Sequence, residues 1–425
     1  MKARWTVAVV LATLSLVLSV YAHQDKGSQM SEGEIIAKAK AIHERALTLD
    51  THVDIGGAQY ATPELDPGSE NSPLKCDLVK MKKGGLDGVF LAVFVGQRPA
   101  LDEAGFKSAY ETAMVKFEAI HRLAEQMHPD KCALATSPAE FERIAGTGKR
   151  AIMTGIENGY PIGKDLSLVK KYYDLGARYI TLSHSGHNQI CDSSGPAQPM
   201  HNGLSPFGKE VVAEMNRLGI MIDVSHISEK SFWDVIQISR APIFASHSGC
   251  AALNPHNRNL TDDQLKALAK NGGVIQVVAL GSFLKADPPE RREAIEALRK
   301  ELGYQRIGRQ EAQAMTEQQR ADYDKLTAAF MERMKEIDAK YPTADMKVFV
   351  DHIDHAVKVA GIDHVGVGTD FDGGGGIRGF NDHSECLNVT IELVRRGYSE
   401  KDIQKIWGGN LLRVWRAVEK AAVRN

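Results

Sequence analysis

The chain lacks the features that mark nucleic-acid-binding proteins, thiol redox proteins and nucleotide-binding loops. Its 425 residues carry 52 basic against 54 acidic side chains, and the basic residues form no run or stripe. The four glycines at 373–376 have neither the GxGxxG spacing nor the Lys-Ser/Thr pair of a phosphate-binding loop. The five cysteines include no CxxC pair, and at most two disulfides could form among Cys76, Cys132, Cys191, Cys250 and Cys386. What remains is a globular chain, 43% hydrophobic, with enough residues for a large core.

A long apolar run begins close to the start of the chain. Lys2 and Arg4 precede "TVAVVLATLSLVLSV", and Ala22 ends the segment that follows. This order is typical of a Sec-type signal peptide, so we expect cleavage after Ala22 and export of residues 23–425, to a bacterial periplasm. An uncleaved membrane anchor is the alternative, although a run of about 15 residues is short for a membrane span.

Eight apolar, β-branched segments alternate with helix-like segments along the rest of the chain. They cover residues 47–53, 88–95, 151–156, 178–183, 220–224, 242–246, 273–280 and 364–369. Alternating strands and helices predict an α/β protein with a (β/α)8 barrel of the TIM type, as a single domain over residues 23–425. The charged, helix-rich stretch over residues 284–345 interrupts this alternation and predicts a helical insertion before the last strand.

Six of these eight segments end in a histidine or a carboxylate. These residues are His52 with Asp54, Glu157, His184, His226, His247 and Asp370. The carboxyl ends of the strands of such a barrel meet on one face, where its active sites are built. One such histidine alone is more often a structural, hydrogen-bonded residue, but six strand ends together predict a shared site.

This set of side chains suits a binuclear metal site. A His-x-Asp pair, two further histidines and one glutamate can hold two divalent cations, and a glutamate can bridge them. Two such cations about 3.5–4 Å apart share a hydroxide and polarise a carbonyl group. Mixed histidine and carboxylate ligands favour zinc. His352 and His355 also have a helical spacing that suits chelation, but we expect them on a solvated helix face.

The order of the motifs resembles the membrane (renal) dipeptidases, a zinc-dependent family of amidohydrolase-type barrels. The series runs through "DTHVD", "GIENG", "LSHSGHN", "DVSHIS", "ASHSG", "NRNLTDD", "GVGTDFDGG" and "GGNLLRV", and covers nearly the whole mature chain. Three features differ from the mammalian members. Gly186 replaces a cysteine, no tyrosine lies in "GGVIQVVAL", and the end "VEKAAVRN" has no hydrophobic tail for a lipid anchor.

The resemblance implies a role for each candidate residue. His52 and Asp54 would bind one zinc, His226 and His247 the other, and Glu157 would bridge the two. His184 would contact the substrate or the developing oxyanion. Arg258 would bind the terminal carboxylate of the substrate, for which a guanidinium fork is suited. Asp370 would carry the proton from the attacking water to the leaving amine.

We therefore predict an exported zinc dipeptidase that acts through a metal-bridging hydroxide, with no nucleic-acid partner and no stable membrane anchor. Dipeptides with a C-terminal D-residue belong to the substrates that the resemblance implies. Another binuclear amidohydrolase, acting on N-acyl amino acids, lactones or β-lactams, is the alternative. A binding protein with an inactive site is the third hypothesis. Members of the family are commonly dimers, so the resemblance includes a homodimer.

Overall fold

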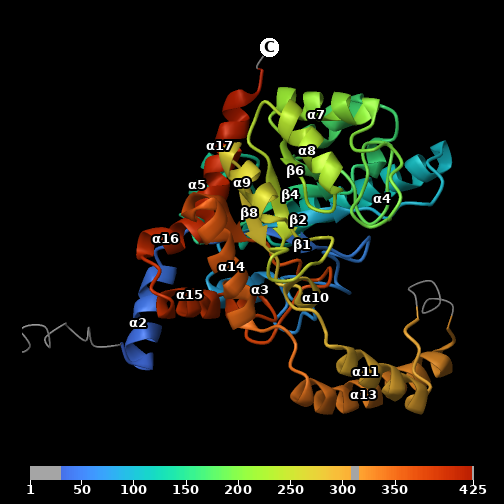
Figure 1. Ribbon diagram of the computed structural model, residues 1–425, viewed down its shortest axis with the longest axis vertical. Coiled ribbons are helices and arrows are strands. Elements are labelled where there is room, and N and C mark those ends of the chain that lie inside the picture. The colour runs from blue at the N-terminus through green and yellow to red at the C-terminus, as the bar shows by residue number, and fades with distance from the viewer. Residues whose placement is uncertain (1–29, 308–314, 424–425) are drawn as a thin grey trace, which may run out of the picture.

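Eight parallel strands form the centre of the molecule, and helices surround them (Figure 1). The computed structural model describes residues 30–307 and 315–423, so the predicted signal peptide over residues 1–22 lies outside the described ranges. The strands are β1 (Leu49–Asp54), β2 (Gly88–Phe94), β4 (Arg150–Glu157), β5 (Ala177–Thr181), β6 (Met221–Asp223), β7 (Phe244–Ser248), β8 (Val274–Val277) and β9 (Val365–Val367). Each overlaps one of the eight predicted segments, so the strand prediction is confirmed. The short β3 (Cys132–Leu134), which pairs with β4, was not predicted.

The strands follow one another around a nearly closed barrel. Neighbouring strands pair in the order β1-β2-β4-β5-β6-β7-β8-β9, all in parallel. The first strand then meets the segment after the last one: Asp54 N–H donates to Phe371 O (2.9 Å), and Asp370 N–H donates to His52 O (2.9 Å). The predicted (β/α)8 barrel is therefore confirmed, and three of the predicted site residues, His52, Asp54 and Asp370, take part in the hydrogen bonds that close it.

The strand register aligns the carboxyl ends of neighbouring strands. Phe94 lies opposite Glu157, Glu157 opposite Thr181, and Thr181 opposite Asp223. Because side chains alternate along each strand, residues at one level of the barrel can converge on the same space. Polar side chains distant in the sequence thus meet at one end of the barrel.

The helices of the barrel begin where the sequence provides capping residues. The Ser228 side chain accepts a hydrogen bond from Ser231 N–H, and Thr261 forms a capping box with Gln264, as Ser and Thr do at helix starts. The helices are α2 (Glu32–His43), α3 (Leu78–Gly84), α4 (Glu103–Arg122), α5 (Pro138–Ala145), α6 (Ser167–Asp174), α7 (Pro206–Leu218), α8 (Glu229–Ile238), α9 (Asp262–Lys270), α10 (Gly281–Leu284), α14 (Met346–Ala360), α15 (Cys386–Arg395), α16 (Glu400–Gln404) and α17 (Asn410–Ala421).

Two further helices lie in the segment where the insertion was predicted. These helices, α11 (Pro289–Leu302) and α13 (Glu317–Lys340), pack on each other and project away from the barrel at the lower right of Figure 1. The segment that follows α11 also packs on α13, since the ring of Tyr304 stacks on that of Phe330 at 4.2 Å between centroids. Phe330 is the one buried residue of α13, so this pair of helices adds little to the main core.

The core lies inside the barrel and between the barrel and its helices. Its largest fully buried side chains include Phe90, Tyr179, Phe244 and Trp415. All five cysteines are free and buried, so the described residues contain no disulfide. Within the described ranges, no helix is both long and apolar enough to cross a membrane.

His352 is not on a solvated helix face, so that prediction is wrong for this residue. Its side chain on α14 is fully buried, Nδ1 accepts a hydrogen bond from Cys250 N–H (3.0 Å), and Nε2 donates to Leu284 O (2.9 Å). His355 lies nearer the surface, where Nε2 is 2.7 Å from Asp262 Oδ1. Helical spacing shows which residues share a face, but the contacts of α14 with Cys250 and with Leu284 of α10 decide that His352 is buried.

Candidate active site

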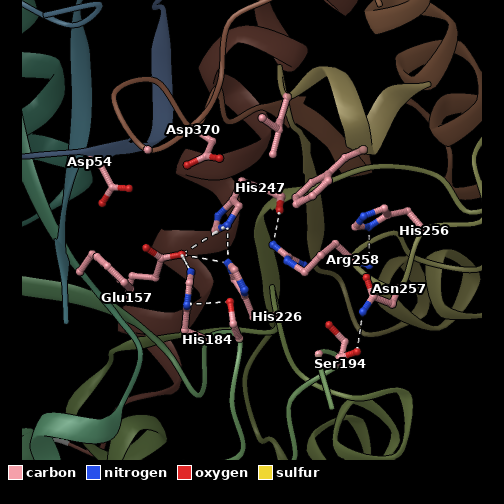
Figure 2. Close-up of a pocket in the computed structure, with 16 residues that line it drawn as sticks. Asp54, Glu157, His184, Ser194, His226, His247, His256, Asn257, Arg258 and Asp370 are labelled. Carbon is pink, nitrogen blue, oxygen red and sulfur yellow. Dashed lines mark hydrogen bonds and ion pairs between the residues drawn. The ribbon is translucent and has the colours of Figure 1, made fainter. Parts of the chain in front are cut away.

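The predicted site residues converge on one cavity of about 400 Å³ at the carboxyl end of the barrel (Figure 2). Seven of the predicted residues line this cavity: Asp54, Glu157, His184, His226, His247, Arg258 and Asp370. The eighth, His52, does not line it but lies beside Glu157. The apolar part of the cavity wall includes Phe94, Leu280 and Phe283. A cavity with an apolar wall and a few convergent polar groups is typical of a small-ligand site.

Glu157, the last residue of β4, lies at the centre of the histidines. Its Oε1 is 2.9 Å from His226 Nε2, 3.5 Å from His247 Nε2 and 3.8 Å from His184 Nε2. Its other oxygen, Oε2, is 3.5 Å from His52 Nε2. Each oxygen of one carboxylate therefore faces a different part of the cluster, which is the arrangement that a bridging ligand requires.

Three overlapping sets of side chains could each hold a cation. In each set, one donor atom per residue lies within 4.8 Å of the others: His52 with Glu157 and His247, Glu157 with His184 and His226, and His52 with Asp54 and Asp370. His247 thus groups with His52 here, whereas the resemblance pairs it with His226. His226 Nε2 and His247 Nε2 are nevertheless only 2.9 Å apart. The two ways of assigning the ligands to metals therefore involve atoms in the same small region.

Burial and neighbouring charges shift the pKa values of these groups in different directions. Burial lowers the pKa values of His226 and His247 well below the ordinary value, which keeps both rings neutral. Burial alone would raise the pKa of Glu157, but His52 and the hydrogen bond from His226 hold it well below the ordinary value. Burial and the nearby Glu157 raise the pKa of Asp54 to about 7. Burial would lower the pKa of His52, but the neighbouring Glu157 raises it to about 10. The cluster therefore combines the neutral imidazoles of His226 and His247 with the ionised pair of His52 and Glu157.

The free donor atoms fit metal ions. His52 Nε2 and Asp54 Oδ1 are buried and have no hydrogen-bond partner in the described part of the chain. In the rings of His52 and His247, the other nitrogen, Nδ1, has a hydrogen-bond partner. His52 Nδ1 lies 2.9 Å from the Tyr179 hydroxyl, and His247 Nδ1 lies 2.8 Å from the Ser246 hydroxyl. Metal-binding histidines commonly hold the second ring nitrogen in this way. These buried donor atoms, together with the two sets of side chains that share Glu157, suggest a binuclear metal site.

Two site residues have left-handed backbone conformations. His226 has a φ angle of 69° and Asp370 has a φ angle of 59°. Unlike glycine, both residues have a Cβ atom, which makes this backbone conformation strained. Such conformations cost about 1–3 kcal/mol each and cluster at functional sites. Both residues follow short strands, β6 and β9, and the sharp turn of the backbone directs their side chains into the cavity.

Sequence reasoning missed two buried carboxylates that join the strand ends. Asp223 Oδ1 accepts the N–H groups of Ser225 (3.0 Å) and Ser246 (2.9 Å), and Oδ2 accepts the hydroxyls of Ser246 (2.6 Å) and Thr181. Asp223 thereby joins the ends of β5, β6 and β7, close in the chain to His226 and His247. Its sequence signal is an acidic residue inside the apolar strand "MIDVS".

Asp50, on β1, is the second buried carboxylate, and it joins the end of β1 to the segment after β9. It accepts the N–H of His52 (3.1 Å) and both the N–H (2.9 Å) and the hydroxyl of Thr369, and it lies 2.7 Å from His383 Nε2. Through these hydrogen bonds the carboxylate of Asp50 links the backbone of His52 to Thr369, the residue before Asp370. Like Asp223, it is an acidic residue within an apolar strand, and it lies two positions before a site histidine.

Arg258 is a buried cation that has no counter-ion within residues 30–307 and 315–423. It is 9% exposed, and its side chain makes one hydrogen bond among the described residues, from Nη2 to His247 O (3.1 Å). Nε has no partner, and no described carboxylate forms an ion pair with the guanidinium. Burial lowers the pKa of Arg258 to about 10. The guanidinium faces the cavity beside the cluster (Figure 2), so an anionic ligand would compensate the buried charge.

His184 and Asp370 lie at opposite sides of the cluster. His184 follows β5, is partly exposed in the cavity and packs against Phe94, with 4.7 Å between ring centroids. Its Nδ1 lies 3.0 Å from the Ser185 hydroxyl, which leaves Nε2 facing the cavity. Burial and the facing Glu157 and Asp54 raise the pKa of Asp370 well above the ordinary value.

Over most of its length the chain matches a known protein family and curated relatives. The family model described as membrane dipeptidase, peptidase family M19, matches residues 36–425. The dipeptidase tcpJ of Claviceps purpurea is 30% identical over 81% of this chain and 70% of its own length. The dipeptidase verJ of Clonostachys rogersoniana is 31% identical over 82% of this chain and 77% of its own length.

Solved structures share the architecture over most of the chain. The crystal structure of the probable dipeptidase PvdM from Pseudomonas aeruginosa is 35% identical, with a TM-score of 0.78, and the match covers 91% of this chain and 99% of that one. A metallo peptidase from Rhodobacter sphaeroides, liganded with a phosphinate mimic of L-Ala-D-Ala, is 23% identical. Its TM-score is 0.67 over 88% of this chain and 99% of that one, which shows a shared fold.

Proposed function

The chain belongs to the membrane dipeptidase family, peptidase family M19, and is a metallo-dipeptidase; from this premise we propose that it holds two zinc ions and cleaves free dipeptides. His52, Asp54, Glu157, His226 and His247 would hold the metals, with Glu157 between them. The observations that support this ligand set are the orphaned His52 Nε2 and Asp54 Oδ1, and the contacts of both Glu157 oxygens. When bound, the metals supply a water of lowered pKa and polarise the scissile carbonyl.

The observation that carries the substrate assignment is the uncompensated guanidinium of Arg258. A dipeptide has a carboxylate one residue beyond its scissile bond, and Arg258 lies beside the cluster in the same cavity. The fork of a guanidinium binds a carboxylate through two charge-assisted hydrogen bonds. Arg258 would therefore fix both the length and the direction of the substrate, with its peptide carbonyl toward Glu157.

Asp370 and His184 would complete the reaction from two sides. Asp370 is placed to take a proton from the attacking water on a carboxylate oxygen and to give it to the nitrogen of the leaving amine. His184 would donate from Nε2 to the carbonyl oxygen as negative charge develops there, because its Nδ1 can accept the hydrogen bond of Ser185. Phe94, Leu280 and Phe283 exclude water from part of the cavity.

The test is an activity panel on protein whose metal content is measured in the same preparation. Zinc-loaded protein should contain two zinc ions per chain and hydrolyse members of a panel of L,L and L,D dipeptides. Lactones, N-acyl amino acids and a β-lactam serve as competing substrates for the alternative amidohydrolase activity. Metal-loaded protein that cleaves a lactone but no dipeptide would contradict the proposal.

We also propose that the protein is exported to a bacterial periplasm and acts there as a homodimer. The support for export is the charged and apolar segment before Ala22. The support for a dimer is the resemblance to the family. Fractionation of cells that express the full chain, followed by light scattering on the mature protein, tests both statements.

A further inference from the structure

A relay of hydrogen bonds leads to His247, one of the histidines proposed as metal ligands. It begins at Asp223 on β6, whose Oδ2 accepts the Ser246 hydroxyl at 2.6 Å. It ends at His247, whose Nδ1 lies 2.8 Å from the same hydroxyl oxygen. All three side chains are at most 1% exposed, so water does not compete for these bonds.

The relay has a direction because its first member cannot donate. As a carboxylate, Asp223 only accepts hydrogen bonds, so the single proton of the Ser246 hydroxyl points to it. Ser246 Oγ then has lone pairs left for His247, and the ring must donate its own proton from Nδ1. The Ser225 hydroxyl is an alternative acceptor for Ser246, but at 3.4 Å it is farther away and uncharged.

We propose that Asp223, acting through Ser246, is a positioning residue that selects the tautomer of His247. With its proton on Nδ1, His247 presents a lone pair at Nε2, the atom that lies 3.5 Å from Glu157 Oε1 and 2.9 Å from His226 Nε2. A neutral histidine binds a metal only through an unprotonated nitrogen. The inference rests on the proposed function, because it assigns Nε2 to a zinc ion.

The substitution Asp223→Asn would reverse the relay. The amide oxygen would keep the place of Oδ1, which accepts the N–H groups of Ser225 and Ser246. The amide NH₂ would then take the place of Oδ2 and donate to Ser246 Oγ. The Ser246 proton would turn toward His247 Nδ1, and the proton of His247 would move to Nε2, where it blocks the metal.

Thr181 provides a matched control within the same network. Its hydroxyl also donates to Asp223 Oδ2, and it is as buried as Ser246, but no hydrogen bond leads from it to a site histidine. Thr181→Val and Ser246→Ala therefore each remove one buried hydroxyl from the same carboxylate oxygen. Only Ser246→Ala breaks the path to His247.

The experiment measures zinc affinity by competition with a chromogenic chelator, together with the visible spectrum of the cobalt-substituted protein. Asp223→Asn and Ser246→Ala should weaken zinc binding by about 10- to 100-fold and change the cobalt spectrum, which is the usual effect of losing such a partner. Thr181→Val should lower thermal stability and keep the wild-type zinc affinity and spectrum. Ser246→Thr, which restores the hydroxyl, should recover the zinc affinity.

Two results would overturn the relay. One is an equal loss of zinc affinity in Thr181→Val and Ser246→Ala, which would indicate a structural role for the whole network. The other is a wild-type affinity in Ser246→Ala. If Asp223→Asn does not fold, the comparison of Ser246→Ala with Ser246→Thr decides the matter alone. Failure of the proposed function is recognised separately, because wild-type protein would then bind no zinc.

Discussion

Replacing Arg258 with methionine should lower activity strongly while leaving the folded protein as stable or more stable. Methionine keeps much of the length and apolar surface of the side chain but removes the guanidinium. A buried arginine in an ordinary ion pair would behave differently, because its removal leaves the partner carboxylate buried and unpaired. Arg258 has no such partner among the described residues.

The magnitude follows from the two roles of the cation. Burial lowers the pKa of Arg258 from its ordinary value to about 10, and at 1.36 kcal/mol per pKa unit this corresponds to a cost of about 3 kcal/mol. Losing the hydrogen bond to His247 O offsets about 1 kcal/mol of the gain. Two charge-assisted bonds to a substrate carboxylate are worth about 1.5–3 kcal/mol each, so kcat/KM should fall by about 10²- to 10⁴-fold.

The assay compares a dipeptide with the same dipeptide as a C-terminal carboxamide. Wild-type protein should prefer the free carboxylate, and Arg258→Met should abolish this preference, with most of the loss confined to the carboxylate substrate. Thermal unfolding of both proteins without substrate gives the stability. The reasoning is refuted if Arg258→Met unfolds at a much lower temperature, or if it slows both substrates equally.

The other predictions concern the metals, the proton carrier and a buried histidine outside the site. Asp370→Asn should lower kcat by about 10²- to 10⁴-fold and leave the zinc content at two per chain, whereas His52→Ala should lower zinc content and rate together; elemental analysis separates the cases. Removal of metal by a chelator should lower the unfolding temperature, because ligands that bind only the folded state stabilise it, and added zinc should restore it. Burial lowers the pKa of His352 in the folded protein, so its contribution to stability is present above the unfolded value, about 6.5, and is lost as the pH falls below it. Denaturant midpoints between about pH 5 and pH 7.5 should therefore depend less on pH in His352→Gln than in the wild type.

Much of the site was predictable because a parallel barrel turns strand order into spatial order. His52, Glu157 and His247 belong to strands far apart in the sequence, yet each lies at the carboxyl end of its strand. Recognising the strands was therefore sufficient to predict that these residues meet. The prediction needed no knowledge of loop conformation, since the ends of parallel strands share one face.

Positions that depend on packing were less predictable. His352 has the same helical context in the sequence as His355, but only the packing of its helix shows that it is buried and bonded to Cys250 and Leu284. Arg258 lies in a loop, where the sequence without the resemblance does not distinguish an arginine in a surface ion pair from one that binds a ligand. Its burial without a counter-ion follows from the loops around it.

The sequence by itself determined the eight strands, the face on which their polar ends gather and the kinds of ligand available there. The apolar segments show where the strands lie, and their alternation with helical segments along the chain is sufficient to predict a barrel. Only the tertiary structure decided which atoms meet: both oxygens of Glu157 among four histidines, and Asp223 linked through Ser246 to His247. Hydrogen-bond direction and burial arise between residues of different strands, and no local pattern encodes them.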